Sequence, residues 1–317
     1  MSRNRAIPWP GSGRITLASL AVVPAIMAYP WRSPRDYWLL GIAVIVVIAL
    51  FGWWRGLHFT TILRRRLAMI RRGRGPQPGS VTRTTALLRM GSSAPDSLPL
   101  PLIAGYLNRY GIRADSIRIT RRDSATGERQ TWIGLTVDAT DNLAALRARS
   151  ARLPLPETAE VAARRLADHL REIGWDASTV DPAELPRVLA DDSPESRETW
   201  RGLRHSDSDH VAAYQVRVDE ALPETLDAIR SYPARETWTA LEIAGAAGTR
   251  YTIAAGCALR TDTQPGNAAP LAGLTPQYGR HRTALLALDP LSTRRLDGHT
   301  EVPADLLTRL QTAVSRA

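Results

Sequence analysis

Lysine is absent from this chain of 317 residues, and each of its 41 basic residues is an arginine. Without lysine the phosphate-binding loop G-x-x-x-x-G-K-[ST] is impossible, and neither G-x-G-x-x-G nor the serine-hydrolase elbow G-x-S-x-G occurs. Cysteine occurs once, as Cys257, which excludes an internal disulfide and argues against a cysteine-based zinc site. This residue lies in an apolar strand pattern, where a small buried thiol is expected rather than a nucleophile. We therefore expect no cofactor and no catalytic residue.

Long apolar runs are scarce outside the N-terminal part of the chain. Residues 37–54 carry no charged side chain, and at about 1.5 Å of rise per residue they are just long enough to cross a hydrocarbon core. Amphipathic aromatic side chains settle at membrane interfaces, and here Tyr37 and Trp38 begin the run while Trp53 and Trp54 end it. We expect a transmembrane helix over 37–54, with a buried core helix as the alternative.

A shorter apolar run, residues 15–30, contains Pro24. A basic start and a short apolar region also describe a signal peptide, but no small-x-small cleavage site is convincing and a second apolar run follows almost at once. We expect a membrane helix over about 14–30, kinked at Pro24. The two helices form a hairpin, because the connection between them is too short to hold a domain.

The placement of arginine orients this hairpin. Three arginines precede the first run and two lie in the turn, whereas seven follow the second run: Arg55, Arg64, Arg65, Arg66, Arg71, Arg72 and Arg74. The positive-inside rule therefore puts both termini in the cytoplasm. We expect these seven residues to form a collar against anionic lipid head groups, each contributing about 1 kcal/mol. A nucleic-acid-binding patch is the alternative.

Composition divides the chain into three parts. Residues 1–54 hold both apolar runs, and residues 55–80 are expected to form a basic juxtamembrane helix and a Gly- and Pro-rich linker. Residues 81–317 have the pattern of a cytoplasmic α/β domain with a mixed, partly antiparallel sheet. We expect strands over 116–120, 130–138, 209–218, 236–245, 250–260 and 282–290. We expect helices over 101–112, 156–175, 222–232 and 303–317.

The segment LRHSDSDHVA, residues 203–212, is the strongest candidate for a chemical site. Asp207 and Asp209 spell the D-x-D of metal-dependent glycosyltransferases, in which two carboxylates hold a divalent ion on a diphosphate, and His205 and His210 could bind a transition metal. However, a metal site normally needs three or four converging ligands, and Asp and Ser also favour turns through local hydrogen bonds. We interpret the segment as a polar turn before a strand and expect no metal there.

Three stretches, the last of which includes this segment, are similar to one known family: TWIGLTVD (131–138), VAARRLADHLREIGWDA (161–177) and RETWRGLRHSDSDHVAAYQV (197–216). The chain resembles EccE, a membrane component of the mycobacterial type VII (ESX) secretion systems, and is most like the short form of the ESX system linked to iron acquisition. The resemblance implies a place in the inner membrane beside EccB, EccC and EccD, with EccC supplying the ATPase. It also implies a glycosyltransferase-like fold without that activity, and it carries over no catalytic residue.

The main hypothesis is a non-enzymatic structural subunit of a membrane-embedded secretion complex. Its hairpin anchors it among membrane lipids, its cytoplasmic domain docks on partner subunits, and it has no nucleic-acid partner and no small-molecule substrate. The alternative is a membrane-tethered, metal-dependent glycosyltransferase-like enzyme that uses Asp207 and Asp209. A third hypothesis, a lipid-anchored nucleic-acid binder, rests on the arginine collar alone.

Overall fold

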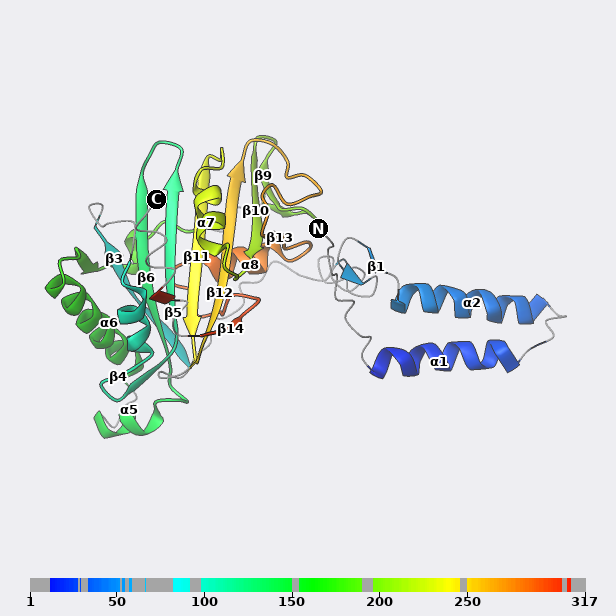
Figure 1. Cartoon of the computed structure of the whole chain (residues 1–317), viewed down its shortest axis with the longest axis horizontal. Helices are drawn as coiled ribbons and strands as arrows, with labels where there is room; N and C mark the ends of the chain where they lie inside the picture. Colours follow the sequence, from blue (N-terminus) through cyan, green and yellow to red (C-terminus); the bar gives the residue numbers. More distant parts are fainter. Residues whose placement is uncertain are drawn as a thin grey trace. The chain divides into compact units, whose positions relative to one another are not determined.

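In a computed structural model of the chain, two compact units are formed by residues 1–75 and 76–317. Figure 1 shows both units with their helices and strands labelled. The structure describes residues 12–27, 29, 34–51, 53–54, 57–58, 66, 82–91, 98–149, 154–189, 196–245, 250–303 and 307–308.

The N-terminal unit contains two helices that pack on each other, α1 (Ser12–Met27) and α2 (Pro34–Phe51). Pro24 lies inside α1. The small side chains of Ala25 and Ala43 are buried, whereas larger apolar side chains on both helices are exposed. Within the described residues, no helix is both long enough and apolar enough to cross a membrane. The transmembrane hairpin therefore stays a prediction.

A short hairpin follows α2, in which β1 (Trp53–Trp54) pairs with β2 (Leu57–His58). The helix expected over 37–54 ends at Phe51, and the juxtamembrane helix expected after residue 55 is wrong at 57–58, where the chain is extended. Gly52 and Gly56 disfavour a helix, and tryptophan favours a strand. Of the collar arginines, Arg66 is described, and it is helical and exposed. The others lie outside the described residues: Arg55, Arg64, Arg65, Arg71, Arg72 and Arg74.

The C-terminal unit is built on one sheet, whose described strands lie in the order β7-β3-β6-β5-β11-β12-β10-β9-β8. In addition, β13 pairs with β10, β14 with β12 and β4 with β5, and each of these described pairings is antiparallel. The strands are β3 (Arg83–Met90), β4 (Asn108–Arg109), β5 (Ile112–Ser124), β6 (Arg129–Asp138), β7 (Ala177–Thr179), β8 (Arg197–Glu198), β9 (Leu203–Ser206), β10 (Asp209–Val216), β11 (Glu236–Ala244), β12 (Arg250–Thr261), β13 (Leu274–Pro276) and β14 (Thr300–Pro303). The expected α/β class is confirmed, and so is the antiparallel pairing; the parallel pairs of a mixed sheet do not occur among the described strands.

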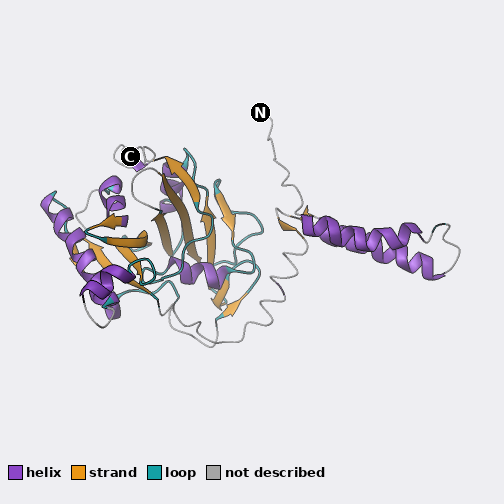
Figure 2. Ribbon diagram, turned by 90° about the horizontal axis from the view of Figure 1, so that it is seen from below, coloured by secondary structure: helices purple, strands orange, loops and turns teal. Residues whose placement is uncertain are grey.

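Helices lie on both sides of this sheet (Figure 2). They are α4 (Leu100–Ala104), α5 (Leu143–Arg149), α6 (Leu155–Glu172), α7 (Leu222–Arg230), α8 (His281–Leu288) and two 3-10 helices, η1 (Gly105–Leu107) and η2 (Pro182–Glu184). Buried residues of α6 and α7 join the larger core cluster on one face, which we call the α6 face. Buried residues of α8 join Trp132 and Trp238 on the other, the α8 face.

The alternation of side chains along the strands assigns residues to the two faces. On β11, Trp238 and Ala240 belong to the core of the α8 face, and Ile243 belongs to that of the α6 face. Since successive side chains of a strand point to opposite faces, Glu242 points to the α8 face. There it is opposite Arg118 of β5, so the sheet places a carboxylate and a guanidinium side by side.

The strand expected over 282–290 is wrong, because residues 282–288 belong to the helix α8. Residues 284–288 are all alanine or leucine, which are strong helix formers. Five consecutive apolar residues have no period that distinguishes a strand from a helix. Leu285 and Leu288 are buried while Leu286 is 40% exposed, so the helix packs only one side against the sheet. The helices expected over 156–175 and 222–232 are confirmed as α6 and α7.

The helix expected over 101–112 is also partly wrong. It ends by Leu107, and the chain turns back at Tyr110 and Gly111, whose φ angles are 56° and 71°. Strand β3 was not expected, although its residues line both cores. Of the helix expected over 303–317, the structure describes Pro303, which ends β14, and residues 307–308, which are helical. The rest lies outside the described residues.

Candidate functional site at the β9–β10 hairpin

The polar segment that stands out in the sequence forms a β-hairpin. His205 lies on β9, Asp209 and His210 begin β10, and Asp207 lies in the turn between the strands. The pairing shifts register between Asp209 and His210, as at a β-bulge. The interpretation as a polar turn before a strand is confirmed, and a short strand also precedes the turn.

The two carboxylates of the D-x-D sequence have different surroundings. Asp209 accepts two hydrogen bonds from Arg260 of the neighbouring strand β12, from Nε at 2.8 Å and from Nη2 at 2.7 Å. The hydrogen bond from Arg260 is the largest cause that lowers the pKa of Asp209, against the effect of burial. The side chain of Asp207 is fully exposed, with one oxygen 3.6 Å from Arg204 Nη1. Asp209 is thus occupied by an arginine while Asp207 faces solvent.

Arg260 also begins a line of alternating charges across the sheet. Its Nη1 lies 3.3 Å from Glu236 of β11, and Glu236 in turn pairs with Arg122 of β5. The guanidinium of Arg122 lies 5.9 Å from the ring of Trp238. Each charge in this line has a partner of opposite sign on the next strand.

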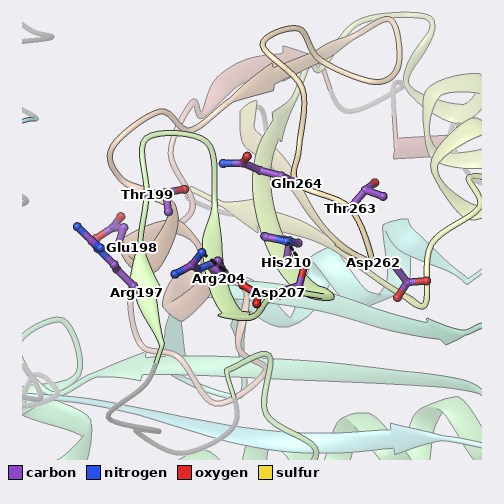
Figure 3. A pocket seen from close by; sticks show the side chains of 9 residues that line it. All are labelled: Arg197, Glu198, Thr199, Arg204, Asp207, His210, Asp262, Thr263 and Gln264. Atoms are coloured by element: carbon purple, nitrogen blue, oxygen red, sulfur yellow. Dashed lines mark hydrogen bonds and ion pairs between the residues drawn. The ribbon is translucent and has the colours of Figure 1, made fainter.

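A hollow of about 600 Å³ lies beside the hairpin (Figure 3). Its ionisable lining residues are Arg197, Glu198, Arg204, Asp207, His210 and Asp262. Two arginines thus face three carboxylates, which gives neither a cationic cradle for a phosphate nor a group of carboxylates alone. Nε2 of the buried His210 lies 3.2 Å from the carbonyl oxygen of Asp207. Among the described residues, no three His, Cys, Asp or Glu side chains form a group that could hold a metal.

His205, the other histidine of the segment, also lacks the surroundings of a metal ligand. His205 is half-buried, and burial lowers the pKa of its imidazole while the nearby Asp209 opposes that effect. Its charged surroundings also include Arg260 and Arg282, which favour the neutral ring. The structure therefore brings together the four residues of the segment without giving them a shared ligand geometry.

The most deeply buried charges lie on the α8 face, at residues that the sequence analysis did not single out. Arg118 and Glu242 have side chains that are 3% and 0% exposed, and Arg118 Nε donates to Glu242 Oε2 at 2.9 Å. Glu242 Oε1 accepts from His299 Nε2 at 2.9 Å and from the Leu296 backbone N–H at 3.3 Å. Burial raises the pKa of Glu242, but the hydrogen bonds from His299 and Arg118 bring it below its ordinary value.

Hydrogen bonds and ion pairs of these charged residues hold one segment, residues 289–299, against the sheet. Arg295 Nη2 donates to Asp115 Oδ1 at 2.7 Å, and Arg118 donates to the backbone carbonyls of Asp289, Ser292 and Arg294. No local pattern could have revealed this cluster, because Arg118 and Glu242 are 124 positions apart. Both strands carry further charged residues, so nothing in the sequence distinguished Arg118 from the other arginines of β5 or Glu242 from Glu236 of β11.

Cys257 is fully buried on the α6 face, and burial raises the pKa of its thiol. The expectation of a small buried thiol is confirmed.

Comparison with known proteins gives one consistent family. The model of the EccE family, described as a "type VII ESX secretion system translocon", matches residues 125–216, from the β5–β6 turn to the end of β10. Proteins named ESX-3 secretion system protein EccE3 from Mycobacterium tuberculosis strains CDC 1551 and H37Rv are each 67% identical over 307 residues, which cover 95% of this chain and 92% of the relative. A protein of the same name from Mycolicibacterium smegmatis is 50% identical over 301 residues, 94% of each chain. Because this identity extends over nearly the whole length, the chain belongs to the EccE family.

Proposed function

We propose that this chain is a non-enzymatic structural subunit of the ESX-3 type VII secretion complex. Its family membership over 95% of the chain is the observation that carries the proposal. The geometry of the D-x-D segment supports it against the glycosyltransferase alternative, because Asp209 is bound to Arg260 and Asp207 points to solvent. A carboxylate pair that held a divalent ion would need both side chains free to converge on it.

In this proposal the N-terminal unit anchors the chain in the cytoplasmic membrane as a hairpin, with both termini in the cytoplasm. Exposed apolar side chains on both packed helices support it, since these residues would contact lipid: Leu20, Val23, Ile26, Met27, Ile42 and Val44. Tyr37 and Trp38, which are 61% and 74% exposed, serve as interfacial anchors together with Trp53 and Trp54. The arginine collar over 55–74 contacts anionic lipid heads, and residues 81–317 form the cytoplasmic domain.

The cytoplasmic domain docks on other subunits of the complex, which we propose to be EccB, EccC and EccD. In such an assembly the work of this chain is binding, and the ATPase belongs to EccC. Neither nucleic acid nor a small-molecule substrate has a part in it.

Purification in a mild detergent tests the proposal. Tagged full-length chain should bring EccB, EccC and EccD with it from membranes of a strain that expresses the whole system. A chain that elutes alone under conditions in which the other subunits stay together would refute the assembly role. Titration with Mn²⁺ and a nucleotide-sugar supplies the comparison for the enzyme alternative, and we expect no binding of either.

The topology has its own test, which uses the burial of Cys257. A cysteine at Ser33, in the turn, should react in intact cells with a membrane-impermeant maleimide, whereas a cysteine at Ser80, in the linker, should react only after the cells are opened. The wild-type chain is the matched control, because its one thiol is buried. The reverse labelling pattern would contradict the orientation.

A further inference from the structure

An exposed tyrosine occupies a turn that disfavours it. Tyr110 and Gly111 connect β4 to β5, with Arg109 paired to Ile112, so the loop has two residues. Both have positive φ, 56° and 71°, as a type I′ turn requires. Such turns favour asparagine or glycine at the first position, because a larger side chain is strained there. Tyr110 is nevertheless present and is 53% exposed, so burial in the core does not account for it.

Two guanidinium groups lie on this ring. The Cζ atom of Arg109 is 5.3 Å from the Tyr110 centroid and that of Arg165, on α6, is 4.7 Å away. Arg109 also lies 4.8 Å from the ring of Tyr106. The Tyr106 hydroxyl donates to the Arg165 carbonyl at 3.1 Å, which fixes the turn beside α6. We call Tyr106, Arg109, Tyr110 and Arg165 the tyrosine–arginine patch; Figure 1 shows β4 and α6 at the same end of the sheet.

The two arginines of the patch differ from their neighbours on α6. Arg164 pairs with Glu160 at 3.8 Å and Arg171 with Asp168 at 2.5 Å, both within the helix. Among the described residues, no carboxylate lies within 4.0 Å of the guanidinium of Arg109 or Arg165. A guanidinium has five N–H donors, so two that lie on one ring without an acidic partner can still bind a carboxylate.

Apolar surface borders the patch along the same row of α6. Val161, Arg165 and His169 follow one another at intervals of four residues, which places them on one ridge of the helix, and Ile173 comes directly after its last residue. Val161 is 43% and Ile173 is 47% exposed. Exposed tyrosine and arginine between aliphatic side chains match the composition of energetically dominant residues at protein interfaces.

We propose that the tyrosine–arginine patch is a docking site for a carboxylate-bearing peptide segment of another subunit of the secretion complex. Arg109 and Arg165 would each take a carboxylate, and the Tyr110 ring with Val161 and Ile173 would receive the apolar side chains around it. A peptide can place its carboxylates at Arg109 and Arg165 alone, whereas a flat anionic bilayer would also face acids of α6 and be repelled by them. The acidic residues of this helix are Glu157, Glu160, Asp168 and Glu172. The inference rests on the proposed function.

The first test compares two variants of the full-length chain within the complex. Tyr110→Asn combined with Arg165→Glu removes the ring and reverses one charge, while asparagine suits the turn, so the protein should fold as well as the wild type. We expect the amount of one partner subunit that co-purifies to fall about tenfold or more, as for loss of a dominant interface residue. Arg164→Glu is the matched control, an exposed arginine one position away, and it should retain the partner.

The outcomes separate the two proposals. If the wild-type chain brings no partner, the structural role fails. If partners are retained equally by the wild type, the patch variant and the control, only the docking site fails. Thermal unfolding of each variant in the same detergent shows that a loss of binding is not a loss of folding.

A second test identifies the occupant. Replacing Tyr110 by the photo-crosslinking residue p-benzoylphenylalanine in the full-length chain should give an adduct with another subunit, at a segment that contains Asp or Glu. Adducts with lipid or with a second copy of this chain would overturn the proposal, as would an adduct at a segment without acidic residues. The same crosslinker at Arg164 is the control for adducts formed by mere proximity.

Discussion

Glu242→Gln should lower the free energy of unfolding by about 3–5 kcal/mol, because it removes one charge of a buried pair and leaves the other uncompensated. The structure supports a value in that range, since the side chains of Arg118 and Glu242 are 3% and 0% exposed and solvent cannot screen the unpaired charge of Arg118. Backbone carbonyls still accept hydrogen bonds from Arg118, but they do not neutralise it. The glutamine oxygen can keep accepting from the Leu296 N–H, so the loss belongs mainly to the charge.

Thermal unfolding of the full-length chain in mild detergent measures this effect. Trp132 and Trp238, buried and stacked at 5.7 Å, provide a fluorescence signal from the same face of the sheet. A unit of this size loses about 2–4 °C of Tm per kcal/mol, so we expect a decrease of about 6–20 °C. The control is Glu301→Gln: Glu301 is 71% exposed and lies 3.6 Å from Arg250. An exposed pair of this kind contributes at most about 1 kcal/mol.

Equal decreases in Tm for the two glutamine variants would refute the reasoning, because they would show that burial does not set the cost. A double variant, Arg118→Met with Glu242→Leu, provides a further check. Replacing both charges by apolar groups should recover much of the lost stability. If the double variant is instead less stable than Glu242→Gln, the ion pair itself contributes more than the absence of an unpaired charge.

Asp209→Ala should lower the free energy of unfolding by about 1–3 kcal/mol, because Arg260 loses a charged hydrogen-bond partner. Asp207→Ala should change it by less than about 0.5 kcal/mol. Thermal unfolding compares the two variants, and equal losses would contradict the different surroundings assigned to the two carboxylates. Tm should fall as the pH drops below about 4, because Asp138 and Asp209 have folded-state pKa values below the ordinary 3.8, so the unfolded chain takes up protons first. A Tm that rises between pH 4 and pH 3 would contradict this sign. Cys257 should resist maleimide in the folded chain and react fully in denaturant, because it is buried and burial raises the pKa of its thiol. Mass spectrometry measures the modification. Rapid labelling of the native chain would show that the thiol is accessible and would contradict the prediction.

Sequence patterns located the elements whose signals are local. The hairpin β5–β6 alternates around a turn with Gly127, and α6 has a polar and an apolar side, so both could be predicted. The run 282–290 could not be assigned, because consecutive apolar residues suit a helix and a strand equally and only packing against β10 and β12 decides between them. Strand β3 was missed because polar residues, Arg83 to Thr85, open it.

In the candidate site, too, local features could be predicted from the sequence and contacts between distant residues could not. The turn at Asp207 followed from the preference of Asp and Ser for local hydrogen bonds. The partners of Asp209 and Glu242 could not be predicted in this way. Arg260 and Arg118 are far from them in the sequence and contact them only because of the order of the strands. The tyrosine–arginine patch likewise depends on a two-residue turn placed beside α6.

The two ends of the sheet limit how copies of this chain can associate. β7, at one end, has three residues, and β8, at the other, has two. A longer strand with free backbone groups would be a template for pairing with a neighbouring molecule, and short terminal strands are one way in which proteins prevent this. When many copies are crowded together, open-ended growth of one sheet into the next is therefore disfavoured, and contacts through side chains and turns remain available for ordered assembly.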